Sequence, residues 1–95
     1  MERFYKDFPI LSQKINGKPI VYFDNACVTL KPKQVIDAVT DYYTNFSACA
    51  GRSSHTLGET VSKKVDESRK TIASFLGARR KEEIIFTRNT TEAIN

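Results

Sequence analysis

This 95-residue sequence contains two long helical patterns but few strand-like runs. The shortage of strands is the feature that most limits the fold the chain can adopt. Strand-like runs occur only at residues 20–23 and 83–86, where β-branched and aromatic side chains gather. Apolar residues recurring every three or four positions predict amphipathic helices at about 32–45 and 57–76. Because a parallel sheet needs several strands with helices over both faces, we expect an α/β layer that is incomplete in this chain.

The boundaries of these elements carry local signals. An Asn-Gly pair at 16–17 predicts a tight hairpin, because both residues tolerate positive φ. Pro32 suits the first turn of a helix, where its missing N–H costs nothing. Thr56 and Glu59 match a capping box for the second helix. Gly77 stands where a left-handed residue would end that helix.

Composition and charge argue against several classes of function. The net charge is +4, but the basic residues lie in separate pairs among acidic ones, which is typical of solvated helix surfaces and does not indicate a nucleic-acid interface. Cys27, Cys49 and His55 lack the spacing of a metal site. No apolar run is long enough to span a bilayer, and the first residues lack the apolar core of a secretory signal, so we expect a cytoplasmic protein.

Three polar segments could carry chemistry. The turn 88–91 precedes a helix start, where N–H groups and threonine hydroxyls suit a phosphate, although local physics favours Thr90 or Thr91 as a simple helix cap. The loop 24–29 follows a strand-like run, at the edge where α/β sheets bind ligands, or it is a plain turn. The linker between the helices carries Arg52, suited to a carboxylate or phosphate, and His55, suited to proton transfer, or both are ordinary surface groups.

Taken in order, several segments resemble the amino-terminal part of the class V aminotransferases, most closely the group of cysteine desulfurases and selenocysteine lyases. The matching stretches are "FPIL" at 8–11, "NGKPIVYFDNA" at 16–26, "KPKQVIDAV" at 31–39, "YY" at 42–43, "GRSSHTLGE" at 51–59, "FLGA" at 75–78 and "EEIIFTRNTTEAIN" at 82–95. Each stretch is weak alone, and their order and spacing make the match specific.

The resemblance implies a pyridoxal 5'-phosphate (PLP) enzyme with the aspartate aminotransferase type of α/β fold, of which this chain is an incomplete amino-terminal portion. It assigns residues 1–30 to an arm with a hairpin or strand and an active-site loop. It assigns 31–77 to two helices joined by a substrate loop, and 78–95 to the first strand and helix start of the large PLP-binding domain. The residues it assigns to the cofactor are Asn89, Thr90 and Thr91, and those it assigns to the substrate are Asn25, Ala26, Arg52 and His55.

The implied reaction removes sulfur from L-cysteine, giving alanine and an enzyme-bound persulfide for iron-sulfur cluster assembly or other sulfur transfer. The implied full-length enzyme is a homodimer with an amino-acid substrate and a sulfur-acceptor or scaffold protein as partner. The Schiff-base lysine and the persulfide cysteine of the family belong to later segments, so we expect no catalytic residue among these 95 and no activity of this piece alone.

Three positions depart from the family pattern. Cys27 and Val28 replace small residues, Gly51 replaces the first histidine of the substrate loop, and Asn89 replaces a frequent glycine. The change at Gly51 weakens the assignment of cysteine as substrate and leaves another class V lyase or transferase open. A small basic module that binds nucleic acid or protein is the alternative of a different class.

Overall fold

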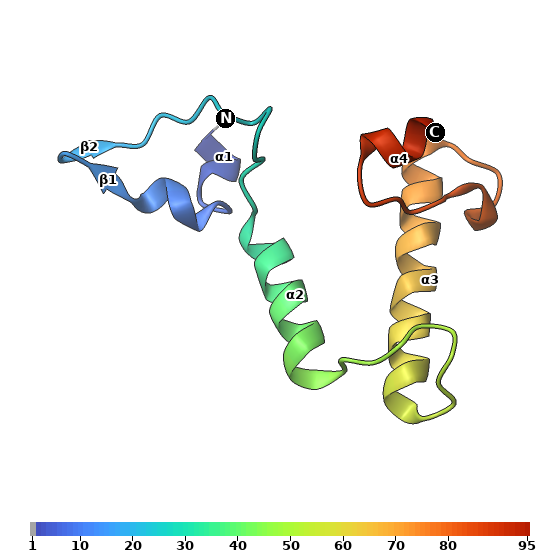
Figure 1. Cartoon of the computed structure of the whole chain (residues 1–95). Coiled ribbons are helices and arrows are strands. Elements are labelled where there is room, and N and C mark those ends of the chain that lie inside the picture. The colour runs from blue at the N-terminus through green and yellow to red at the C-terminus, as the bar shows by residue number, and fades with distance from the viewer. Residues whose placement is uncertain (1) are drawn as a thin grey trace. The chain divides into compact units, whose positions relative to one another are not determined.

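The computed structural model describes residues 2–95 and divides into two compact units, Met1–Asn45 and Phe46–Asn95 (Figure 1). The first unit contains α1 (Glu2–Tyr5), η1 (Pro9–Ser12), β1 (Lys14–Ile15), β2 (Lys18–Pro19) and α2 (Lys33–Asn45). The second contains α3 (Thr56–Leu76), η2 (Lys81–Glu83) and α4 (Thr90–Ile94). Here α denotes an α-helix and η a 3-10 helix. No helix among residues 2–95 is long and apolar enough to cross a membrane.

The predicted hairpin is confirmed. Strands β1 and β2 pair antiparallel, with Lys14 opposite Pro19 and Ile15 opposite Lys18. Asn16 and Gly17 form the turn with φ of 52° and 75°, the left-handed values that a two-residue hairpin turn demands. A local signal of two residues therefore sets this element.

Helix α2 begins at Lys33, one residue after the predicted start at Pro32, and the Pro32 carbonyl accepts the first helical hydrogen bonds. The Lys33 N–H donates to the Asp7 carbonyl at 2.6 Å, which joins the start of α2 to the preceding arm. Val35, Val39 and Tyr43 remain exposed within this structure, so the apolar face of α2 is formed but not covered.

Helix α3 has the predicted length, but its predicted capping box is wrong. The residue that caps α3 is His55, whose Nδ1 accepts from the Gly58 N–H at 3.3 Å, and Thr56 is already helical. A capping box with Glu59 would need Thr56 to be the N-cap residue, just outside the helix, but His55 occupies the N-cap position. At the other end Gly77 is left-handed, with φ 72°, as predicted. The Ala78 N–H then bonds the Ala73 carbonyl at 2.9 Å, which completes a Schellman-type terminus.

Neither predicted strand forms. Residues 20–23 have no regular structure, and Val21 and Phe23 are 75% and 92% exposed. Residues 81–83 form η2, and Ile85 in the extended segment beyond it is 80% exposed. A strand is defined by hydrogen bonds to a neighbour, and no segment within residues 2–95 pairs with either run. The division at 1–30, 31–77 and 78–95 remains a prediction.

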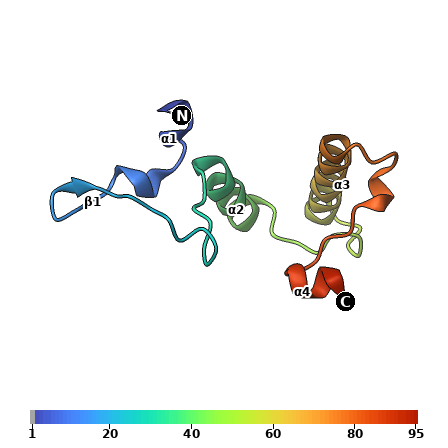
Figure 2. The ribbon, with the colours of Figure 1, turned by 90° about the horizontal axis from the view of Figure 1, so that it is seen from above.

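The small apolar core of the second unit lies on α3, where Val61 and Ala73 are buried. After α3 ends, the chain turns back, and η2 lies beside the helix in both views of the ribbon (Figures 1 and 2). Farther along, the Arg69 guanidinium lies over the Phe86 ring, 5.5 Å from its centroid. These contacts hold the segment that leads to α4 against α3.

Candidate functional site

The turn before α4 is held by a network of hydrogen bonds within five residues. Asn89 is the cap of α4, and its Oδ1 accepts from the Glu92 N–H at 2.9 Å. Glu92 in turn accepts from the Arg88 N–H at 2.7 Å and from the Arg88 Nε at 3.2 Å. The hydrogen bond from the Arg88 side chain, followed by that from its backbone, lowers the pKa of Glu92. The turn is therefore closed by its own side chains.

This closure leaves donors free at Thr90 and Thr91. Their N–H groups belong to the first turn of α4, where a helix supplies no acceptor. Within residues 2–95 neither threonine hydroxyl makes a hydrogen bond, and both residues are exposed. Two hydroxyls and two N–H groups at a helix start form a donor set that suits a phosphate dianion. Helix α4 thus starts as predicted, with Asn89 rather than a threonine as its cap.

The loop 24–29 is a compact turn in the first unit. The N–H groups of Cys27 and Val28 both donate to the Asp24 carbonyl at 3.1 Å. Asn25 contributes to the wall of a cavity of about 440 Å³, whereas Ala26 is exposed and does not line it. The residues that line the cavity are Tyr5, Phe8, Leu11, Ile20, Tyr22, Asn25, Thr29 and Leu30. Its wall is mostly apolar and aromatic, with the Asn25 amide among its few polar groups.

Residues 51–55, here called the Arg52 loop, lead into α3. His55 uses Nδ1 as the acceptor of the α3 cap, so its neutral ring carries the proton on Nε2. His55 is exposed, and the ring can therefore offer Nε2–H as a hydrogen-bond donor. Arg52 is also exposed, and no residue within 2–95 is its hydrogen-bond or ion-pair partner. A free guanidinium of this kind is suited to a carboxylate.

The predicted site residues fall into three groups. Asn25 and Ala26 lie in the first unit, and the other five lie in the second. Within the second unit, no hydrogen bond among the described residues joins the Arg52 loop to the turn before α4. Sequence reasoning missed Ser62, which receives a hydrogen bond from the Gly51 N–H, because a lone serine in a helix carries no signal of a contact eleven residues away.

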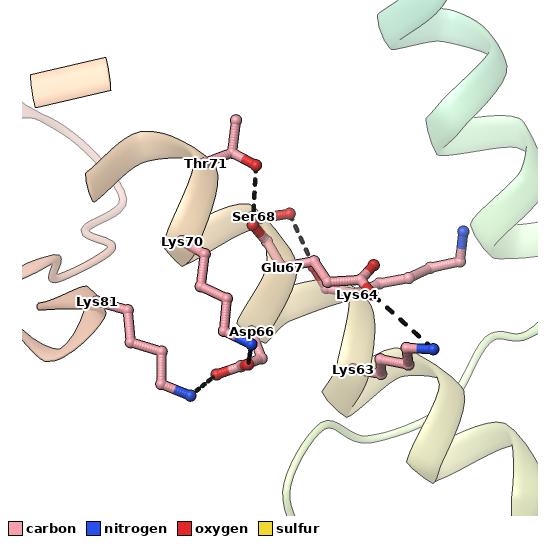
Figure 3. Close-up of polar contacts among 8 residues, drawn as sticks. All are labelled: Lys63, Lys64, Asp66, Glu67, Ser68, Lys70, Thr71 and Lys81. Atoms are coloured by element: carbon pink, nitrogen blue, oxygen red, sulfur yellow. Dashed lines mark hydrogen bonds and ion pairs between the residues drawn. The ribbon is translucent and has the colours of Figure 1, made fainter. Parts of the chain in front are cut away.

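A charged cluster on α3 stabilises the return of the chain. Asp66 forms ion pairs with Lys70, at 2.8 Å, and with Lys81 of η2 (Figure 3). The hydrogen bond from Lys70, then that from Lys81, lowers the pKa of Asp66 to about 2, and the same pairing raises the pKa of Lys70. Asp66 therefore stays ionised at any physiological pH, and it links η2 to the middle of α3.

Known proteins share this arrangement of segments. The structure matches that of a cysteine desulfurase from Thermococcus onnurineus NA1 with a TM-score of 0.83 and 39% sequence identity, over 98% of this chain and 22% of that one. The two units thus have the α/β fold of an aminotransferase-type enzyme, as the resemblance predicts, and this chain contains only a part of that fold.

The family model "Aminotransferase class-V" matches residues 21–95, and the chain belongs to this family. A cysteine desulfurase of Enterobacter sp. (strain 638) is 41% identical over all 95 residues, which are 23% of that protein. A protein of Mycolicibacterium paratuberculosis named as a probable cysteine desulfurase is 44% identical over 89 residues, 94% of this chain and 13% of its own length. The chain therefore spans less than a quarter of each of these relatives.

Proposed function

We propose that this chain is part of a PLP-dependent cysteine desulfurase. The full reaction takes sulfur from L-cysteine, leaves alanine, and holds the sulfur as a persulfide on an enzyme cysteine. The observation that carries the proposal is the similarity of this chain to relatives named as cysteine desulfurases, which extends over 94 to 100% of the chain.

The donor set at residues 89–91 supports a role in holding the cofactor phosphate. The hydroxyls and N–H groups of Thr90 and Thr91 would donate to phosphate oxygens, and Asn89 would fix the turn through its cap while its amide nitrogen remains a further donor. When bound, PLP supplies the electron sink for bond cleavage at the substrate amino acid. The role of these residues is to hold the phosphate and so orient the ring.

The substrate would meet the other two segments. Arg52 carries an exposed, unpaired guanidinium suited to the α-carboxylate of an amino acid, and His55 offers Nε2–H as a donor. Asn25 would present its amide at the cavity in the first unit, with Ala26 next to it leaving room for a ligand. Cysteine is the substrate that the relatives' names support, despite the replacement of a family histidine by Gly51.

The remaining features of the proposal concern the assembled enzyme. We expect a homodimer located in the cytoplasm, delivering sulfur to an acceptor or scaffold protein for iron-sulfur cluster assembly. These features rest on the family and not on contacts in this chain.

Absorbance of the longer protein that contains this chain tests the proposal. With PLP added, we expect the visible band of a lysine-bound cofactor, which borohydride abolishes, and release of alanine from L-cysteine. A protein that binds PLP but yields no alanine from L-cysteine would point to another class V lyase or transferase. A protein that shows no such band would contradict the proposal altogether.

A further inference from the structure

The Arg52 loop is attached to α3 at every second residue. Residues 51, 53 and 55 each contact the first two turns of the helix, whereas no hydrogen bond among the described residues joins Arg52 or Ser54 to it. The attachment therefore presents Arg52 to its surroundings while the backbone on both sides of it is held.

The contact at residue 51 is a hydrogen bond to Ser62. The Gly51 N–H donates to the Ser62 Oγ at 2.8 Å, and the same hydroxyl donates to the Gly58 carbonyl at 2.7 Å. Nothing lies within 4 Å of the position that a Gly51 Cβ would occupy, and a cavity of about 290 Å³ lies beside this contact. A side chain at residue 51 would therefore enter open space, and the hydrogen bond to the Ser62 hydroxyl attaches Gly51 to the helix.

The contacts at residues 53 and 55 both depend on Gly58. A Cβ on Gly58 would lie 2.5 Å from the Ser53 Cβ, so the absence of a side chain lets the loop touch the helix backbone. The Gly58 N–H donates to the His55 Nδ1, and the Gly58 carbonyl accepts from Ser62. Gly58 and Ser62, one turn apart, thus form a single docking point for the loop.

We propose that Ser62 is a positioning residue that holds Arg52 in place to bind an anionic group of the substrate. The proposal rests on the function proposed above only in its last step, the binding of substrate by Arg52. Without the Ser62 hydroxyl, the loop keeps its attachment at residues 53 and 55 and loses the one that precedes Arg52. Arg52 then samples more positions, and its anion-binding position is occupied for less of the time.

Amide exchange in the 95-residue chain, followed residue by residue by NMR, tests the attachment. Ser62→Ala should speed exchange of the Gly51 N–H by about five-fold, the factor expected for loss of one ordinary hydrogen bond. Ser62→Thr, which keeps a hydroxyl, should restore slow exchange. The matched control is Ser68→Ala, because Ser68 Oγ also donates to the carbonyl four residues earlier, at 2.9 Å to Lys64, but receives nothing from the loop.

Three results of this experiment would overturn the proposal. They are an unprotected Gly51 amide in the unmodified chain, equal exchange with and without the Ser62 hydroxyl, and an equal effect of Ser68→Ala at Gly51. Each would show that the helix surface at Ser62 does not hold the loop.

Kinetics of the complete PLP-loaded enzyme test the last step. We expect Ser62→Ala to raise KM for L-cysteine on the order of five-fold while kcat stays within about two-fold, with recovery in Ser62→Thr. In an Arg52→Ala background, adding Ser62→Ala should not change KM further, because Ser62 affects KM only through the position of Arg52. A fall in kcat at unchanged KM contradicts the positioning role. An unmodified enzyme that is inactive on L-cysteine refutes the proposed function, and the exchange experiment still decides the attachment.

Discussion

Replacing Gly58 by alanine should loosen the start of α3. The new Cβ would lie 2.5 Å from the Ser53 Cβ and 2.7 Å from the Ser53 carbonyl oxygen, whereas ordinary contacts begin at 3.4 Å, so the loop must retreat by nearly 1 Å. Overpacking of this kind costs about 1 to 3 kcal/mol. Alanine recovers about 1 kcal/mol through its higher helix propensity. We therefore expect a net loss of about 1 kcal/mol in the local free energy of opening, with an upper value of about 2 kcal/mol.

Amide exchange at Glu59 reports this opening directly, because the Glu59 N–H donates to the His55 carbonyl at 3.1 Å. A loss of about 1 kcal/mol corresponds to exchange that is about five times faster. Gly77→Ala is the spatial control, since Gly77 has nothing within 4 Å but a φ of 72°, and its effect should appear at the other end of α3. Unchanged or slower exchange at Glu59 in Gly58→Ala would refute the argument from close approach.

Three further predictions concern other parts of the chain. In the complete enzyme, Thr91→Ala should weaken PLP binding by about 10- to 100-fold, the cost of one hydrogen bond to a charged group, and Thr91→Ser should retain most of the affinity; equal binding by all three would exclude a phosphate contact there. Because the pKa of Asp66 is lowered to about 2, its pairing with Lys70 and Lys81 should stabilise the chain fully above pH 4 and be lost as the pH falls through 2. NMR titration of the Asp66 carboxyl checks this, and a midpoint near the ordinary 3.8 would contradict it. The 95-residue chain alone should release no sulfide from L-cysteine above the rate of free PLP, because the resemblance assigns the family's catalytic lysine and cysteine to later segments.

The candidate site was predictable where one segment carries its own chemistry. The turn 88–91 was found from its hydroxyls and its place before a helix start, and the structure adds that Asn89 is the cap. The sequence indicates Arg52 and His55 by their chemistry as polar residues of a linker. It does not indicate the use of His55 Nδ1 as the α3 cap, because Thr56 carries the stronger capping signal. The roles of these residues in binding remain predictions.

The sequence by itself determined the elements whose stabilising contacts are local. The Asn16-Gly17 turn, the extent of α2 and α3, and the left-handed Gly77 all depend on residues within a few positions of one another. Only the tertiary structure decided the rest. The runs at 20–23 and 83–86 have the composition of strands, yet a strand exists only when another segment completes its hydrogen bonds, and residues 2–95 provide none. The attachment of Gly51 to Ser62 and of Lys81 to Asp66 likewise depends on how the chain folds back on α3, which no local pattern specifies.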